Sequence, residues 1–126
     1  MDNIFVAGTK QTPEVNLERG KIKFTGRSVP SDPECFYQPL LEWMNEYHSK
    51  GLNDTHIELK FEYINTASTK WIFNILKLLG SDPSASNKIQ VSWYYEEGDD
   101  DMYDLGKIFM SLVPSDFKFI EIPEQA

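Results

Sequence analysis

The chain has 126 residues, of which 40% are hydrophobic and 13% aromatic, so it can bury one ordinary core and is expected to form a single domain over residues 1–126. Twenty acidic residues against twelve basic ones give a net charge of -8, which disfavours nucleic acid and anionic lipid as partners. No secretory leader and no apolar run of roughly 20 residues is present, and the lone Cys35 cannot form an internal disulfide. We therefore expect a cytoplasmic protein with no membrane insertion.

The first half of the chain predicts two strands and one helix. A brief apolar run at 4–6 reads as a short strand followed by a loop to residue 20, and Ile22 and Phe24 alternate with polar residues in a strand over 21–27. Two prolines within 26–33 then break the chain. From 35 to 49, apolar residues at helical spacing predict a helix with Pro39 in its first turn. These residues are Phe36, Leu40, Leu41, Met44 and Tyr47.

The second half alternates strands and helices more clearly. Residues 57–63 alternate apolar and polar side chains, with Ile57, Leu59, Phe61 and Tyr63 on one face. A helical stripe follows and ends at Gly80; its members are Trp71, Ile72, Ile75, Leu76 and Leu79. After a loop at 81–87, we expect a strand over 89–95, a helix and a final strand over 117–122. The last helix carries Met102, Leu105, Phe109 and Leu112.

This order of elements favours crossover connections between strands. The sequence therefore predicts an α/β fold, in which a mixed central sheet of about five strands packs with three main helices.

The sequence contains no recognisable catalytic or nucleotide-binding motif. The seven glycines are scattered, so neither a P-loop nor a dinucleotide fingerprint is present, and His48 and His56 are expected to be solvated. The acidic run from Glu96 to Asp104 lacks the residue order of a calcium loop and suits a solvated helix start or a surface that faces a partner. We therefore expect no catalytic residue, no metal site and no cofactor, and a protein that is not an enzyme.

The most informative segment is the polar stretch Asn65-Thr66-Ala67-Ser68-Thr69, which joins a strand to an amphipathic helix. Asn65 is a good N-cap, and the hydroxyls that follow lie beside unpaired N–H groups at the positive end of the helix dipole. A phosphate on Thr66 or Ser68 would meet several donors there and could switch an interface. The alternative is that the stretch is only a redundant helix cap.

Several motifs resemble those of the SiaC family of bacterial regulatory phosphoproteins. They are Gly8-Thr9 with Thr12-Pro13, Asp32-Pro33, Pro39-Leu40-Leu41-Glu42-Trp43, Tyr63-Ile64-Asn65-Thr66-Ala67-Ser68-Thr69-Lys70-Trp71 and Trp93-Tyr94-Tyr95-Glu96-Glu97. The resemblance implies a fold similar to STAS domains, with Thr66 as the phosphoacceptor and Ser68 as the second choice. The family often has serine where this chain has Ala67, and Thr69 adds a hydroxyl that is not general in the family.

The resemblance also implies a partner-switching circuit. A Ser/Thr protein kinase of histidine-kinase-like fold would modify the protein, and a PP2C-type phosphatase would reverse the modification. The unmodified form would bind and activate a diguanylate cyclase, a GGDEF protein of c-di-GMP signalling, through a surface that includes Asn65, Thr66, Ser68, Thr69 and Lys70. Two alternatives remain: an anti-sigma factor antagonist acting on an anti-sigma kinase, and a small ligand-binding domain that uses Trp93, Tyr94, Tyr95 and Glu96.

Overall fold

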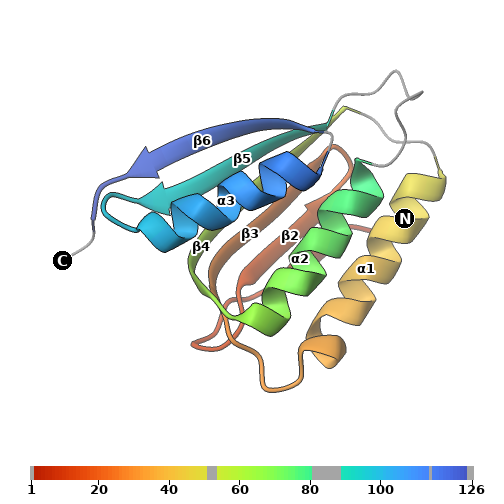
Figure 1. Cartoon of the computed structure of the whole chain (residues 1–126). Helices are drawn as coiled ribbons and strands as arrows, with labels where there is room; N and C mark the ends of the chain where they lie inside the picture. The colour runs from red at the N-terminus through yellow and green to blue at the C-terminus, as the bar shows by residue number, and fades with distance from the viewer. Residues whose placement is uncertain (1, 51–53, 81–88, 114, 125–126) are drawn as a thin grey trace.

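The computed structural model describes residues 2–50, 54–80, 89–113 and 115–124 of the chain. The strands are β1 (Ile4–Val6), β2 (Glu14–Glu18), β3 (Lys21–Ser28), β4 (Thr55–Ile64), β5 (Ile89–Glu96) and β6 (Asp116–Ile122), and the helices are α1 (Pro33–Ser49), α2 (Thr66–Leu79) and α3 (Asp100–Leu112). The strands form one six-stranded sheet in the order β1-β2-β3-β4-β5-β6 (Figure 1). The pairs β1–β2 and β2–β3 are antiparallel, and the other three pairs are parallel.

All three helices lie on one face of this sheet (Figure 1). Each helix connects two neighbouring parallel strands and the strand order always advances in the same direction, so right-handed crossovers place every helix on the same side. The N-termini of the helices therefore follow the carboxyl ends of β3, β4 and β5 at one edge of the sheet, which is where sites form in parallel sheets. The two segments richest in candidate site residues, 65–70 and 96–104, both lie at this edge.

The core lies between the sheet and the helices and is rich in aromatic rings. Trp93 is fully buried beneath α3, and its Nε1 donates to the Met102 carbonyl oxygen over 2.9 Å. Gly106 permits this close approach, because a Cβ there would lie 2.5 Å from Trp93 Cδ1. The opposite face of the sheet carries polar contacts, including a 2.7 Å hydrogen bond between His56 Nε2 and Ser92 Oγ.

The predicted α/β class and the three helices are confirmed, but the sheet has six strands rather than about five. The loop expected up to residue 20 is wrong, because Glu14–Glu18 forms β2 and pairs with β3. Only two apolar residues, Val15 and Leu17, mark this strand, and both are fully buried. The turn into β3 uses Gly20 at a φ of 84°, a left-handed conformation that suits glycine.

Three positions differ from the expected pattern. The helix α1 begins at Pro33 and not near 35, with Asp32 as its N-cap, so Pro39 lies in the helix interior instead of the first turn. Pro39 is exposed, so water can reach the Cys35 carbonyl group that the proline ring leaves without a donor. On α3, Leu112 is 57% exposed instead of joining the core. The loop expected at 81–87 lies outside the described residues.

Tyr63 also leaves the buried face on which alternation places it. The register of β3 against β4 shifts after Gly26, so that Arg27 pairs with Tyr63 and Glu62 has no counterpart. The extra residue changes the direction of the side chains at the end of β4, and Tyr63 is 51% exposed. The Cζ atom of Arg27 lies over the Tyr63 ring, 5.5 Å from the ring centroid. The strand therefore presents Glu62 and Tyr63 at the same edge as the start of α2.

The contact between Gly106 and Trp93 gives a stability test. The substitution Gly106→Ala should lower the free energy of unfolding by about 1–2 kcal/mol, because overpacking against a fixed indole outweighs the gain of about 1 kcal/mol in helix propensity. The added methyl group would also lie 2.8 Å from Phe119 Cε2. The matched control on the exposed side of α3 is Ser111→Ala, which should change stability by less than about 0.5 kcal/mol in urea unfolding. Equal stability of Gly106→Ala and the wild type would contradict this account of the packing.

Candidate functional site

The junction between β4 and α2 is built around Asn65. Its side-chain Oδ1 accepts from the Ser68 amide N–H over 2.9 Å, and its carbonyl oxygen accepts from the Thr69 amide N–H and hydroxyl, each over 3.0 Å. Asn65 is thus the N-cap of α2, as the sequence predicts. Capping satisfies one of the first-turn N–H groups, and those of Thr66 and Ala67 have no intrahelical acceptor.

The hydroxyl groups of the junction lie in different environments. Thr66, the first residue of α2, is exposed. Ser68 is fully buried, and Thr69 is half-buried with its Oγ1 bound to the Asn65 carbonyl oxygen. The structure therefore leaves Thr66 as the accessible hydroxyl among the three, and it separates Ser68, the second-choice phosphoacceptor, from the protein surface.

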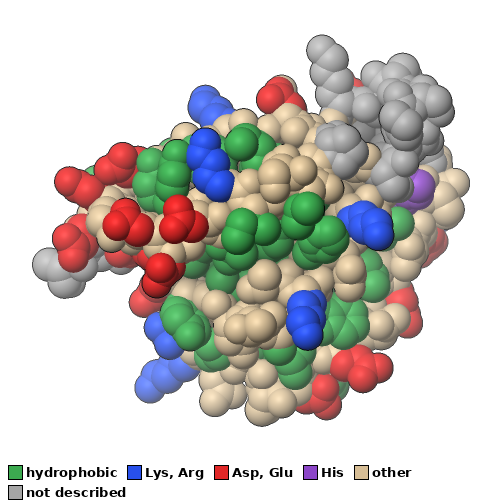
Figure 2. All heavy atoms as spheres, viewed as in Figure 1, with side chains coloured by type: hydrophobic (Ala, Val, Ile, Leu, Met, Phe, Trp, Pro, Cys, Tyr) green, Lys and Arg blue, Asp and Glu red, His purple; other side chains and the backbone are tan. Residues whose placement is uncertain are grey.

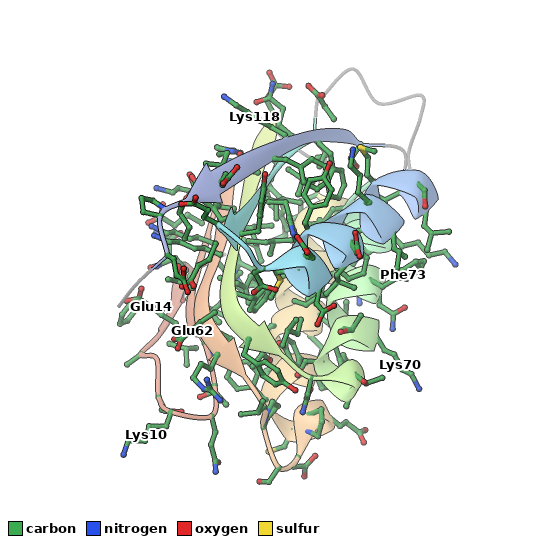
Figure 3. All side chains as sticks on the ribbon, turned by 60° about the vertical axis from the view of Figure 1, so that its left-hand side comes forward. Lys10, Glu14, Glu62, Lys70, Phe73 and Lys118 are labelled. Atoms are coloured by element: carbon green, nitrogen blue, oxygen red, sulfur yellow. The ribbon has the colours of Figure 1, made fainter. Side chains whose placement is uncertain are left out.

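Lys70 lies one turn after Thr66 on α2 and is exposed. Figure 3 shows its side chain projecting away from the helix into solvent. Residues four apart on a helix lie on the same side of it, so the ammonium group of Lys70 can reach a charge placed on Thr66. Four of the five predicted partner-binding residues, Asn65, Thr66, Thr69 and Lys70, therefore reach the surface at least in part, while Ser68 does not.

A buried chain of hydroxyl groups holds this junction in place. Ser68 Oγ donates to the Ser28 carbonyl oxygen over 3.2 Å, and Ser28 Oγ donates to Ser68 Oγ over 2.8 Å. The Tyr37 hydroxyl lies 2.5 Å from Ser28 Oγ and supplies the remaining donor. The Ser28 carbonyl oxygen also accepts from the Asn65 amide N–H over 3.0 Å. Strand β3, helix α1 and the start of α2 are thereby fixed to one another.

Aromatic packing reinforces the same connection. The ring of Tyr37 stacks on Trp71 of α2 with centroids 5.9 Å apart and an interplanar angle of 11°. Burial raises the pKa of the Tyr37 phenol above its ordinary value and outweighs the opposite effect of the Ser28 and Ser68 hydroxyls. A neutral phenol is therefore the form that the folded protein favours.

The acidic run begins α3. Asp99 is the N-cap, with Oδ1 accepting from the Met102 amide N–H over 3.1 Å, and Asp100 and Asp101 occupy the first turn. These positions place negative charge at the positive end of the helix dipole, so the interpretation of a helix start is confirmed for this part of the run. Asp101 and Asp104 are exposed and free to face a partner.

An open hollow of about 440 Å³ lies between the end of β4 and the first half of α3. Its lining comes from both segments: Glu62, Tyr63, Ile64, Asp99, Asp101, Met102, Asp104, Leu105 and Ile108. Figure 2 shows acidic side chains gathered over the start of α3, next to hydrophobic side chains that lie between α3 and α2. Ile64, which lines the hollow, lies two residues before Thr66 in the chain.

Two further candidates for chemistry, His56 and Glu96, lie in the described part of the chain. His56 is half-buried and bonded to Ser92, instead of being fully solvated as predicted. No group of three or more potential metal ligands occurs among the described residues, and no described helix is both long and apolar enough to cross a membrane. Beside Glu96, a hollow of about 190 Å³ is smaller than the roughly 300–1,000 Å³ of typical ligand pockets.

The sequence model of one family, described as SiaC family regulatory phosphoprotein, matches residues 6–122. The chain belongs to the SiaC family. A further relative is a protein of Pseudomonas aeruginosa strain UCBPP-PA14 that is itself named uncharacterized protein PA14_02130. It is 22% identical to this SiaC-family chain over 111 residues, which cover 86% of this chain and 88% of the relative.

Solved structures show the fold of this SiaC-family chain at low sequence identity. SiaC of Pseudomonas aeruginosa matches with a TM-score of 0.88 and 21% identity, over 97% of this chain and 100% of the other. A structure of the Pseudomonas aeruginosa diguanylate cyclase SiaD in complex with its activator SiaC matches with a TM-score of 0.87 and 21% identity, over 94% of this chain and 99% of the other. The apo form of the same SiaC gives 0.85 at 21% identity, over 95% and 99%.

Sequence reasoning missed the residues that support and border the junction of this SiaC-family chain. Ser28 contacts Ser68 from 40 positions away, and no periodic pattern reports such a contact. Tyr37 is fully buried but falls outside the stripe used to predict α1. Ile108 lies on the exposed side of α3 and is 53% exposed, which gives it no core signal. The one hint in the sequence was that Ile108 is apolar although it lies outside the core stripe of α3.

The buried phenol predicts a specific pH dependence. Its folded pKa lies above the unfolded value of about 10, so its stabilising contribution is complete below pH 10 and is lost as pH rises towards the folded pKa. The variant Tyr37→Phe should lose about 1 kcal/mol of stability at pH 7 and should be less sensitive to pH above 10 than the wild type. Urea unfolding of both proteins between pH 7 and the alkaline limit measures the difference. Parallel stability curves above pH 10 would contradict the prediction.

Proposed function

We propose that this chain is a non-catalytic switch protein of the cytoplasm in which Thr66 is reversibly phosphorylated. In its unphosphorylated form it binds and activates a diguanylate cyclase and so acts in c-di-GMP signalling that controls biofilm formation and aggregation. The single observation that carries the proposal is the exposure of Thr66 at a fixed helix N-terminus, where Ser68 is buried and Thr69 is already hydrogen-bonded.

The local chemistry at Thr66 favours a phosphate group. A phosphate adds about 1.5 to 2 negative charges and three strong acceptor oxygens. It would stand at the positive end of the α2 dipole, near the first-turn N–H groups and within reach of Lys70. Phosphorylation at this position therefore costs α2 no stability, and the modified protein stays folded with a changed surface.

The partners follow from the family and not from the geometry alone. Membership of the SiaC family of regulatory phosphoproteins supports a protein that is phosphorylated. The motifs that resemble this family imply that a Ser/Thr kinase of histidine-kinase-like fold and a PP2C-type phosphatase are the enzymes that act on Thr66. The complex of SiaD with its activator SiaC supports a diguanylate cyclase as the regulated partner. The family assignment also favours this circuit over the alternative of an anti-sigma factor antagonist.

Ser68 is the weaker candidate for modification. Its hydroxyl is fully buried and donates to the Ser28 carbonyl oxygen, so a kinase would reach it only after the start of α2 opens. A dianion in that environment would also face burial without a counterion. Within the partner-binding surface, Ser68 acts by positioning α2, and Asn65, Thr66, Thr69 and Lys70 provide the contacts.

The decisive experiment compares Thr66→Ala, Thr66→Glu and a matched control, Thr69→Ala, which removes a hydroxyl from the same helical turn. Thr66→Ala should abolish phosphate incorporation by the kinase and keep the cyclase fully active. Thr66→Glu should weaken cyclase binding by about tenfold, and Thr69→Ala should still incorporate phosphate as the wild type does. Mass spectrometry reports the modified residue, and c-di-GMP production by the diguanylate cyclases of the source genome reports activation.

Two results would overturn the proposal. Undiminished phosphorylation of Thr66→Ala would show that the acceptor is another residue. Full cyclase activation by Thr66→Glu, and by the fully phosphorylated wild type, would show that a charge at this position does not control the partner.

A further inference from the structure

The hollow between the end of β4 and α3 combines an apolar floor with an acidic rim. Tyr63 and Ile108 on its wall are 51% and 53% exposed, and Leu105 between them is half-buried. Large apolar side chains grouped around one concave surface are unusual on a monomer and mark binding sites. Leu112, one turn beyond Ile108 on α3, is 57% exposed and extends the apolar surface along the helix.

The charged residues that line the hollow in the described part of the chain are all acidic: Glu62, Asp99, Asp101 and Asp104. Arg27 does not line it, but its guanidinium group lies over the Tyr63 ring. Two of these acids have other roles, because Asp99 caps α3 and Glu62 Oε1 lies 3.8 Å from Arg27 Nη1. Asp101 and Asp104 lie three residues apart on exposed positions of α3 and remain available to a cation. The surface thus offers apolar contacts flanked by negative charge.

We propose that this hollow is the docking groove for a basic amphipathic helix of the regulated partner, an inference that rests on the proposed function. Apolar side chains spaced at i, i+4 and i+7 on the partner helix fill the space between Tyr63, Leu105 and Ile108. Lysine or arginine residues beside them meet Asp101 and Asp104. Charge complementarity decides the occupant: a second copy of this chain carries a net charge of -8 and the same acidic groove, so it would be repelled.

The groove also defines how phosphate on Thr66 acts. An added dianion raises the attraction of the whole surface for a basic helix, so net charge alone would strengthen binding. Phosphate weakens binding only if the partner covers Thr66 closely, because bulk and the loss of hydration then outweigh the long-range attraction. Thr66 follows Ile64, a lining residue, by two positions in the chain, so a partner helix that extends past Ile64 would cover it.

The test uses a fluorescent peptide of about 18 residues with leucines at i, i+4 and i+7 and lysines on both flanks. A second peptide keeps the leucines and carries glutamates in place of the lysines. Anisotropy titration against the full chain gives the affinity of each. The basic peptide should bind, the acidic peptide should bind at least tenfold more weakly, and rising salt should weaken the basic peptide.

Matched variants locate the site. Ile108→Asp and the pair Asp101→Asn with Asp104→Asn should each weaken the basic peptide by about tenfold. The control for Ile108→Asp is Met110→Asp, which adds the same charge on another side of α3. The control for the pair of Asp-to-Asn changes is Glu42→Gln with Asp116→Asn, which changes the net charge by the same amount at exposed positions outside the groove. Both controls should bind as the wild type does. Thermal unfolding of every variant shows whether a change in affinity reflects misfolding.

Three outcomes would overturn the proposal of a docking groove. The control variants could weaken peptide binding as much as the groove variants do, the two peptides could bind with equal affinity, or neither peptide could bind. A chain that is dimeric alone and becomes monomeric with Ile108→Asp would show that a second copy occupies the groove. If the peptide does not bind but cyclase activation still depends on Thr66, the docking groove is refuted and the proposed function stands. If the peptide binds in the groove but cyclase activity does not respond to changes at Thr66, the docking groove stands and the proposed function is refuted.

Discussion

The carbonyl oxygen of Ser28 is the point on which the junction depends. It accepts hydrogen bonds from the Asn65 amide and the Ser68 hydroxyl, while the side chain of the same serine bonds to Tyr37 on α1. One residue at the end of β3 therefore determines where α2 begins and how α1 packs beside it. The rotation of α2 about its axis follows from this attachment, and the exposure of Thr66 follows from that rotation. The exposure of the Thr66 hydroxyl thus depends on a contact that is buried beneath it.

The helices and the N-cap at Asn65 were predictable because their signals are local and periodic. The strand β2 was missed because only Val15 and Leu17 mark it and pairing with β3 supplies the rest of its definition. Tyr63 was misplaced because one extra residue in β4 reverses the alternation, and a register shift depends on the neighbouring strand. For the site, the sequence identifies the hydroxyl-rich junction and the acidic run, but only the folded chain places them at the same edge.

The order of strands explains why two separate sequence features become one surface. Sequential parallel strands bring the starts of α2 and α3 to neighbouring positions, so the end of β4, which leads into the hydroxyl-rich turn, and the acidic start of α3 line one hollow. This arrangement sets two electrostatic effects against each other. The dipole of α2 and Lys70 accommodate an added dianion, whereas a partner that covers Thr66 must remove water from that dianion. In the proposed switch, this opposition would give a phosphate on Thr66 a large effect on partner binding and a small effect on folding stability.

The geometry of an α-helix has a consequence for the choice of acceptor. Thr66 and Ser68 are two residues apart, so with 3.6 residues per turn their side chains point in directions about 200° apart. When Ser68 points into the core, Thr66 must point to the outside. The proposed kinase would not need to distinguish Thr66 from Ser68 by sequence, because the fold exposes only one of these two hydroxyl groups. Insertion of a single residue between Asn65 and Ser68 would rotate the turn by about 100° and remove that selectivity without changing any hydroxyl group.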